Sequence, residues 1–252
     1  MDLFSVSGKV VVITGGSMGL GRAMAVGFGE SGARVVVASR SKGLIEETAQ
    51  EIIKNGGSAT AIQVDVKNSG DIEKMLTAAV DLYGGVDILI NNAGIAPMTR
   101  SIDMTEEEWD NVIDTNLKSV FLASKLAGRM MIRQRRGRII NIASVLGKMA
   151  SSVAVHYCSS KAGVIQLTRA QALEWARFNI NVNCIAPGFF DTDMTKAQQS
   201  DEKHRAFLYS KIPCQRLGKP EEILGTALFL ASEASSYITG ATIFVDGGYS
   251  VW

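Results

Sequence analysis

Residues 155–161, VHYCSSK, bring together several side chains that can transfer a proton or act as a nucleophile. Tyr157 and Lys161 are spaced so that a helix would place them on one face, within interaction distance. An ammonium group beside a phenol favours the phenolate and lowers its pKa from about 10, which would make Tyr157 an acid or base near neutral pH. The same stretch is compatible with a Cys/His hydrolase, a Ser/His esterase, or a surface Tyr–Lys pair without a chemical role.

A glycine-rich turn, TGGSMGLG at 14–21, follows the first apolar segment of the chain. Glycines allow a tight turn and a close approach of backbone to a ligand, and the start of a following helix offers free N–H groups to an anion. The pattern TGxxxGxG is a variant of the dinucleotide-binding fingerprint. The cofactor contacts predicted in this turn are Gly15, Ser17, Met18, Gly19, Leu20 and Gly21.

The same turn contains GGSMG at 15–19, which matches the GxSxG nucleophile elbow of α/β-hydrolases and would make Ser17 a nucleophile. No oxyanion-loop sequence of the HGGG type precedes it, and an elbow has no need of Gly21, so the hydrolase is a minor alternative. A glycine turn that only packs a helix on a strand is the purely structural one.

The second apolar segment ends in VVVASRSK, about where NAD-binding proteins place an acidic residue that binds the ribose 2′-hydroxyl. Ser39 occupies that position and is followed by Arg40 and then Lys42. A hydroxyl and a guanidinium suit a 2′-phosphate, so we predict NADP(H) in preference to NAD(H). The alternative is that Arg40 is a solvated residue at a helix start. Met18 adds no charge in the glycine turn.

Short β-branched segments alternate with amphipathic ones along the chain. This alternation predicts an α/β fold, a doubly wound, Rossmann-like three-layer sandwich with a parallel seven-stranded sheet, and places ligands beyond the carboxyl ends of the strands. No linker divides residues 1–252, so we expect a single domain. The expected strands are 9–14, 33–39, 59–64, 86–91, 137–143, 180–186 and 241–246, and the expected helices lie near 20–31, 42–55, 70–83, 105–130, 151–177 and 219–232.

Composition excludes several other classes of protein. A formal net charge of +1 does not favour nucleic acid or an anionic membrane as partner. The chain has no apolar run long enough for a membrane span and no signal peptide. Three widely spaced cysteines predict neither disulfides nor zinc and fit the cytoplasm, and two histidines make a His-based metal site unlikely.

Further motifs occur in order: NNAG at 91–94, a serine thirteen residues before Tyr157, and PG at 187–188. Any one of them is weak evidence. Together with TGxxxGxG and the Tyr-xxx-Lys pair, they resemble the short-chain dehydrogenase/reductase family over nearly the whole chain, from GKVVVITGG to ITGATIFVDGG. The resemblance implies hydride transfer between a nicotinamide cofactor and a ketone or secondary alcohol.

The resemblance implies roles for four residues. Tyr157 would exchange a proton with the substrate oxygen, and Ser144 would hydrogen-bond and orient that oxygen. Lys161 would lower the pKa of the tyrosine and hold the nicotinamide ribose, while Asn116 would hold a water that relays protons to Lys161. The remaining implied cofactor contacts are Asp65 and Val66 at the adenine, Asn92, Ala93 and Gly94 near the riboses and ring, and Pro187, Gly188 and Thr192 at the carboxamide.

The other reactive residues of VHYCSSK receive no catalytic role. We expect His156 to be a packed or capping histidine, with the substrate pocket as its alternative location. Cys158 is expected to face the core, and Ser159 and Ser160 to be ordinary helix residues.

Substrate and assembly are predicted only in outline. The chain looks most like 3-oxoacyl-thioester reductases, with a sugar-acid (gluconate-type) dehydrogenase or a broad carbonyl reductase as alternatives. Arg133, Arg135 and Arg136 form a basic turn that would suit an acidic carrier protein, but Phe178 stands where such reductases often have a second basic residue. Segment 189–215 is expected to form a lid. The family suggests a homotetramer with contacts through 151–177 and the C-terminal tail, and a dinucleotide-binding protein without turnover remains a further alternative.

Overall fold

The computed structural model describes residues 2–195 and 202–251. As the alternating pattern predicts, seven parallel strands form one sheet, and their order is β3-β2-β1-β4-β5-β6-β7. Each expected strand is present with small shifts at its ends. The strands are β1 Val10–Thr14, β2 Arg34–Ser39, β3 Ser58–Gln63, β4 Ile88–Asn91, β5 Gly137–Ile142, β6 Ile180–Pro187 and β7 Thr242–Val245.

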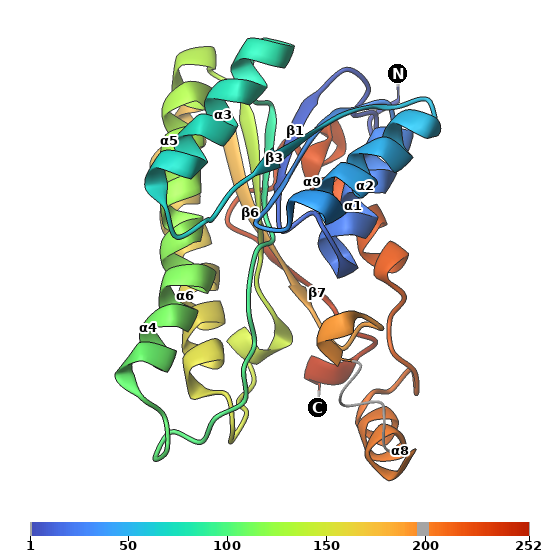
Figure 1. Cartoon of the computed structure of the whole chain (residues 1–252), viewed down its shortest axis with the longest axis vertical. Helices are drawn as coiled ribbons and strands as arrows, with labels where there is room; N and C mark the ends of the chain where they lie inside the picture. The colour runs from blue at the N-terminus through green and yellow to red at the C-terminus, as the bar shows by residue number, and fades with distance from the viewer. Residues whose placement is uncertain (1, 196–201, 252) are drawn as a thin grey trace.

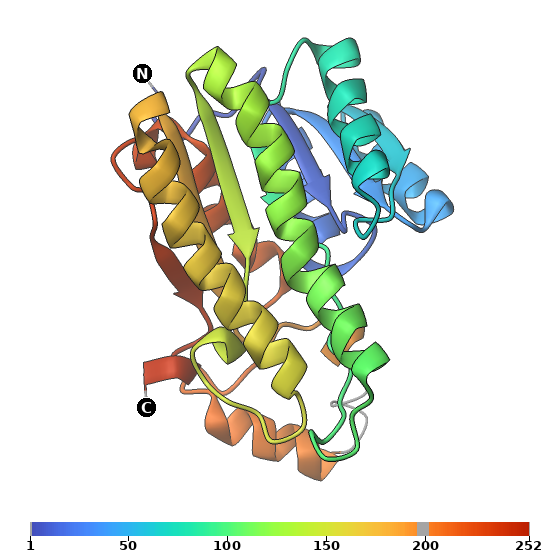
Figure 2. The same cartoon turned by 90° about the vertical axis from the view of Figure 1, so that its left-hand side faces the viewer.

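Helices cover both faces of this sheet, as Figures 1 and 2 show. One layer, on the left of Figure 1, contains α3 (Ser69–Tyr83), α4 (Glu106–Ile113), α5 (Ser119–Gln134) and α6 (Val155–Trp175). The other layer contains α1 (Gly19–Glu30), α2 (Lys42–Lys54) and α9 (Leu224–Ala231). The fold is therefore the predicted three-layer, doubly wound sandwich.

Side-chain alternation in the strands explains the two layers. In β1, Val11 and Ile13 belong to the apolar cluster that includes Phe28 of α1, whereas Val10 and Val12 belong to the cluster on the opposite face. Successive side chains of a strand point to opposite faces, so a strand covered on both sides must be apolar throughout. All five residues of β1 are buried accordingly.

The long segment expected as one helix over 105–130 is divided by a single π-helical turn, Asp114–Lys118, between α4 and α5. Such turns insert an extra residue into a helix and are frequent at functional sites. Asn116 lies in this turn and is fully buried. The expected helix over 151–177 also begins later than predicted, at Val155, after a short parallel bridge between Thr99 and Ala154.

The segment predicted as a lid contains a helix, α8 (Glu202–Lys211), that the sequence did not indicate. Its buried Leu208 forms a small apolar cluster with Ile212 and Leu217, against which Phe189 and Tyr249 pack. This segment therefore packs against the C-terminal turn of the chain. Residues 196–201 of this segment, and Trp252 of the tail, lie outside the described residues.

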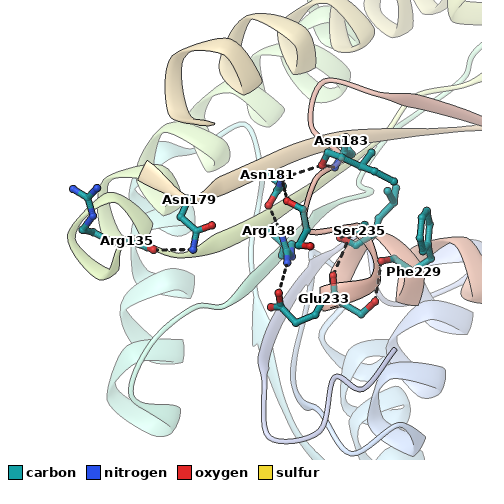
Figure 3. A network of polar contacts seen from close by, with 12 residues as sticks. Arg135, Arg138, Asn179, Asn181, Asn183, Phe229, Glu233 and Ser235 are labelled. Carbon is teal, nitrogen blue, oxygen red and sulfur yellow. Dashed lines mark hydrogen bonds and ion pairs between the residues drawn. The ribbon is translucent and has the colours of Figure 1, made fainter. Parts of the chain in front are cut away.

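The amino end of β5 and β6 carries a polar network, shown in Figure 3. Arg138 forms an ion pair with Glu233 at 3.3 Å and a hydrogen bond with Asn181, whose amide donates to Ser236 O and Ile238 O. These contacts join the two strands to the loop after α9. Ser144 lies beyond the other end of β5, so the network and the basic turn beside it are remote from that serine within one chain.

Strands β4 and β1 are neighbours at the centre of the sheet, and the chain proceeds outward from them in opposite directions. The carboxyl ends of the strands at such a reversal leave a crevice in which α/β proteins bind ligands. No helix within the described part of the chain is long and apolar enough to cross a membrane.

Candidate active site

A cleft of about 320 Å³ opens at the carboxyl ends of the central strands. Every residue predicted to contact the cofactor lines it, from the glycine turn to Thr192. Sequence reasoning missed several other lining residues because they come from loops and strand ends without a recognisable motif. They are Ser41, Val64, Ile95, Thr115, Ile142, Ala143, Phe190, Asp193, Met194 and Thr195.

The glycine turn is shaped to admit backbone and ligand where a side chain would not fit. Gly15 has a φ of +69°, a conformation that favours glycine. A Cβ on Gly21 would lie 2.0 Å from Gly15 O, so the turn and helix α1 touch backbone to backbone. Met18, at the N-cap of α1, makes no side-chain cap. The first N–H groups of α1 thus suit a phosphate, and the turn fits a dinucleotide.

A second anion-binding arrangement lies at the end of β2. Ser39, the exposed Arg40 and Ser41 all line the cleft. Gln63 Nε2 donates to Arg40 O at 2.9 Å and fixes this backbone, while Ser41 stands at the N-cap of α2 without a side-chain cap. Hydroxyls, a guanidinium and an open helix start together match the chemistry of a phosphate group.

The NNAG segment supports both the sheet and the glycine turn. Asn91 is buried, and its amide donates to Ser124 Oγ at 2.9 Å and to Asn141 Oδ1 at 2.8 Å. Asn92 Nδ2 donates to Thr14 O and Gly15 O at 3.1 and 3.0 Å. Asn92 lines the cleft as predicted, but its amide holds the glycine turn in place.

Tyr157 and Lys161 line the cleft, whereas Ser144 follows the lining residue Ala143 and is not itself a lining residue. Ser144 follows β5 in extended conformation, and its Oγ accepts the Leu146 N–H at 3.1 Å. This bond uses an acceptor site of the Ser144 hydroxyl and leaves its hydrogen to interact with Tyr157, whose pKa it lowers. Lys161 Nζ donates to Ile142 O at 2.8 Å and lies 5.6 Å from the centroid of the Tyr157 ring.

The pKa values in this cluster differ from the sequence-based expectation. Burial raises the pKa of Tyr157 above its ordinary value, the hydrogen bond from Ser144 lowers it, and nearby Cys158 raises it. Burial lowers the pKa of Lys161 to about 8, although Cys184 acts to raise it. The predicted lowering of the tyrosine pKa was therefore wrong for this structure, because desolvation outweighs the hydrogen bond.

Asn116 uses its side-chain amide within the protein. Its Oδ1 accepts the Ile95 N–H at 2.8 Å, and its Nδ2 donates to Ile95 O at 2.8 Å and to Ser160 Oγ at 3.3 Å. The amide therefore clamps the residue after NNAG. The water implied by the family resemblance would need another atom of this residue, such as its main-chain carbonyl.

Comparison with known proteins agrees with this geometry. A family model described as enoyl-(acyl carrier protein) reductase matches residues 15–250. A 3-oxoacyl-(acyl-carrier-protein) reductase from Vibrio cholerae serotype O1 is 43% identical over 244 residues, which cover 97% of this chain and 98% of the relative. A 2-dehydro-3-deoxy-D-gluconate 5-dehydrogenase from Escherichia coli K12 is 39% identical over 252 residues, covering 99% and 98%.

A solved structure shows the same arrangement of elements. The gluconate 5-dehydrogenase from Burkholderia cenocepacia J2315, in complex with NADP and tartrate, has a TM-score of 0.96 and 33% identity, and the match covers 100% of this chain and 98% of that one. The chain belongs to the short-chain dehydrogenase/reductase family. As a member, it is an oxidoreductase that acts on hydroxyl or keto groups, and the hydrolase and non-catalytic alternatives are set aside.

The chain has only two histidines, His156 and His204, that could serve a hydrolase nucleophile at Ser17. A serine hydrolase needs a histidine beside its nucleophile. His156 is fully buried in α6, where its Nδ1 accepts the Tyr157 N–H, and its Nε2 has no partner among the described residues. It is thus packed, as expected. The side chain of the other histidine, His204, lies outside the described part of the chain.

Two expectations for the VHYCSSK stretch were wrong. Cys158 is only partly buried and does not face the core fully. Ser160 is fully buried and hydrogen-bonded to both Asn116 and the Tyr157 carbonyl, so it is more than an ordinary helix residue. Ser159 is exposed, as an ordinary helix residue would be.

Proposed function

We propose that this chain is an NADP(H)-dependent reductase of ketones, or dehydrogenase of the matching secondary alcohols, in a single domain. The observation that carries the proposal is a cleft lined by Tyr157 and Lys161 together with Ser39 and Arg40, in which Tyr157 is paired with Ser144 just behind the lining residue Ala143. One end of the cleft thus suits proton transfer and the other a phosphate, which is the layout that a phosphorylated dinucleotide needs.

Ser144, Tyr157 and Lys161 each have a task in this proposal. The nicotinamide, when bound, supplies or accepts the hydride. Tyr157, kept as a neutral phenol by its burial, donates its proton to the substrate oxygen during reduction. The hydroxyl hydrogen of Ser144, which is directed at Tyr157 in this structure, would turn to the same oxygen and stabilise the negative charge that develops there. Lys161 is fixed by Ile142 O, and an ammonium has further N–H donors to offer the ribose hydroxyls.

The cofactor preference predicts an asymmetric effect of Arg40→Ala. A charge-assisted contact contributes about 1.5–3 kcal/mol, so NADPH should bind about tenfold to hundredfold more weakly to the variant while NADH binding stays unchanged. Fluorescence titration of both cofactors measures this. Arg34→Ala, at the opposite end of β2, is the matched control and should leave both affinities unchanged. Equal affinities of the wild-type chain for NADPH and NADH would overturn the preference.

The lowered pKa of Lys161 predicts the pH dependence of reduction. Because the pKa falls to about 8, the ammonium is lost at lower pH than in a free lysine, whereas the phenol of Tyr157 stays protonated over this range. The rate of carbonyl reduction should therefore decline as the pH rises through about 8. In Lys161→Arg the charge persists and the decline should vanish, at a lower overall rate. An unchanged decline in that variant would assign it to another group.

We propose 3-oxoacyl thioesters as the substrate class, supported by the identity to the Vibrio cholerae reductase. The gluconate-type dehydrogenases, including one solved with NADP, support sugar acids as the alternative. The basic turn at 133–136 gives little support to the binding of an acidic carrier protein, because two of its three arginines already have partners within the chain. Arg136 is paired with Asp87 at 3.3 Å, Arg135 reaches Arg177 O at 3.5 Å, and Phe178 has no charge.

We further propose a homotetramer and a cytoplasmic location. Leu173 of α6 and Phe121 of α5 are 87% and 43% exposed, which is unusual for large apolar side chains on two neighbouring helices and suits contact with another copy. Val251 of the tail is also exposed. The three cysteines are free thiols, which supports a reducing compartment.

A further inference from the structure

Ser160 connects the helix that carries Tyr157 and Lys161 to the rest of the site. The side chain is fully buried, one residue before Lys161 on α6. Its hydroxyl donates to Tyr157 O at 2.8 Å and accepts from Asn116 Nδ2 at 3.3 Å. A buried hydroxyl that both donates and accepts has its orientation fixed by two partners.

Asn116 extends this connection to the cleft. It binds Ile95 through both main-chain groups, with distances of 2.8 Å to the N–H and 2.8 Å to the carbonyl oxygen. Rotating the amide by half a turn would place its nitrogen against the Ile95 N–H and its oxygen against Ile95 O and Ser160 Oγ, so its orientation is determined by the contacts. Ser160, Asn116 and Ile95 thus form a continuous polar strut from α6, through the π-helical turn, to the loop after β4.

The strut ends at Ile95, which lines the cofactor cleft together with Gly94 and Lys161. Gly94, which lines the cleft, precedes Ile95, and a Cβ added to Gly94 would lie 3.3 Å from Asn116 Oδ1 and 3.5 Å from Lys161 Nζ. The loop and the lysine therefore face each other closely, and even a methyl group between them would make a tight contact with Asn116. Any change in the length of the strut would alter the spacing between α6 and the cleft.

We propose that Ser160 is a positioning residue that, through Asn116, holds the Tyr157–Lys161 face of α6 at a fixed distance from the loop after β4, which lines the same cofactor cleft. This inference rests on the proposed function, because the distance matters only when a cofactor and a substrate occupy the cleft. Ser160 touches neither of them and acts by placement alone. Displacement of a reacting group by about 1 Å can cost about 10²-fold in rate.

Three substitutions at one position test the role of the hydroxyl. In Ser160→Ala, kcat should fall by about tenfold to hundredfold, whereas NADPH affinity should change little because Arg40 and the glycine turn are untouched. Ser160→Cys fills the same space with only a weak donor and should behave like Ser160→Ala. Ser160→Thr keeps a hydroxyl that can bond the same helix carbonyl and should recover most of the rate.

Ser159→Ala is the matched control, since it makes the same change at an exposed neighbour on the same helix. Rates are expressed per folded molecule, and thermal unfolding of each variant is followed in parallel. If Ser160→Ala does not fold, the kcat of Ser160→Cys tests the positioning role in its place. The positioning role is overturned if an active wild-type chain and the Ala and Cys variants at 160 share the same kcat. It is also overturned if kcat and NADPH affinity fall together. A wild-type chain without activity on any carbonyl compound overturns both this inference and the proposed function.

Discussion

Tyr157→Phe should lower kcat for carbonyl reduction by about 10²- to 10⁴-fold, the usual contribution of a positioned general acid. The phenol is the group that can give a proton to the substrate oxygen beside Ser144, and burial keeps it protonated. The ring itself is retained, so NADPH should still bind. Steady-state kinetics together with a fluorescence titration of NADPH separate the two effects.

Two further variants make this result specific. Tyr237 is fully exposed, and Tyr237→Phe should leave kcat unchanged. Ser17→Ala tests the discarded hydrolase and should reduce activity only slightly, because Ser17 lines the cofactor cleft but lies on the glycine turn. A chain that keeps its reductase activity in Tyr157→Phe would require a different proton donor.

Ser144→Ala should lower kcat by about 10²- to 10³-fold, the scale of losing one donor to a developing oxyanion. The hydrogen bond from Ser144 lowers the pKa of Tyr157, so its loss should raise that pKa further. Oxidation of the alcohol needs the phenolate, and its rate should therefore suffer more than reduction and recover only at higher pH. Rate profiles against pH, measured in both directions, show this difference.

The substitution also removes the cap at Leu146, which can cost about 1 kcal/mol of stability. Thermal unfolding of the variant measures that cost separately from kcat. Ser152→Ala, on the exposed part of the same loop, is the control and should change neither quantity. Equal losses in both directions, with no displacement of the pH profile, would contradict the link between Ser144 and the pKa of Tyr157.

The sheet was predictable because its strands carry their own signal. A strand such as β1 is buried on both faces, so its residues are apolar throughout and stand out between amphipathic helices. The glycine turn was predictable for a similar reason, since Gly15 and Gly21 occupy positions where a Cβ would collide with backbone. Burial on both faces of a strand and close backbone contact at a turn each restrict which residue types can occur at a position, so both can be read from the local sequence.

The features that were missed depend on contacts between distant segments. The π-helical turn at 114–118 and the hydrogen bond of Ser160 to Asn116 form where α6 meets distant parts of the chain, and neither segment alone indicates the other. The direction of the Tyr157 pKa depends on how far the phenol is removed from water, which spacing along a helix does not report. Among the described side chains of helix α8, from residue 205 on, only Leu208 is buried, so no periodic pattern predicted the helix.

The most direct test of the account is to mix the chain with NADPH and a panel of carbonyl compounds and follow the near-ultraviolet absorbance of NADPH. The panel contains acetoacetyl thioesters, keto sugar acids, diketones and cyclic ketones, and the matching alcohols are tested with NADP⁺. The account predicts turnover of at least one class, fastest with the acetoacetyl thioesters, and its loss in Tyr157→Phe. No absorbance change with any member of the panel, in either direction, would contradict it.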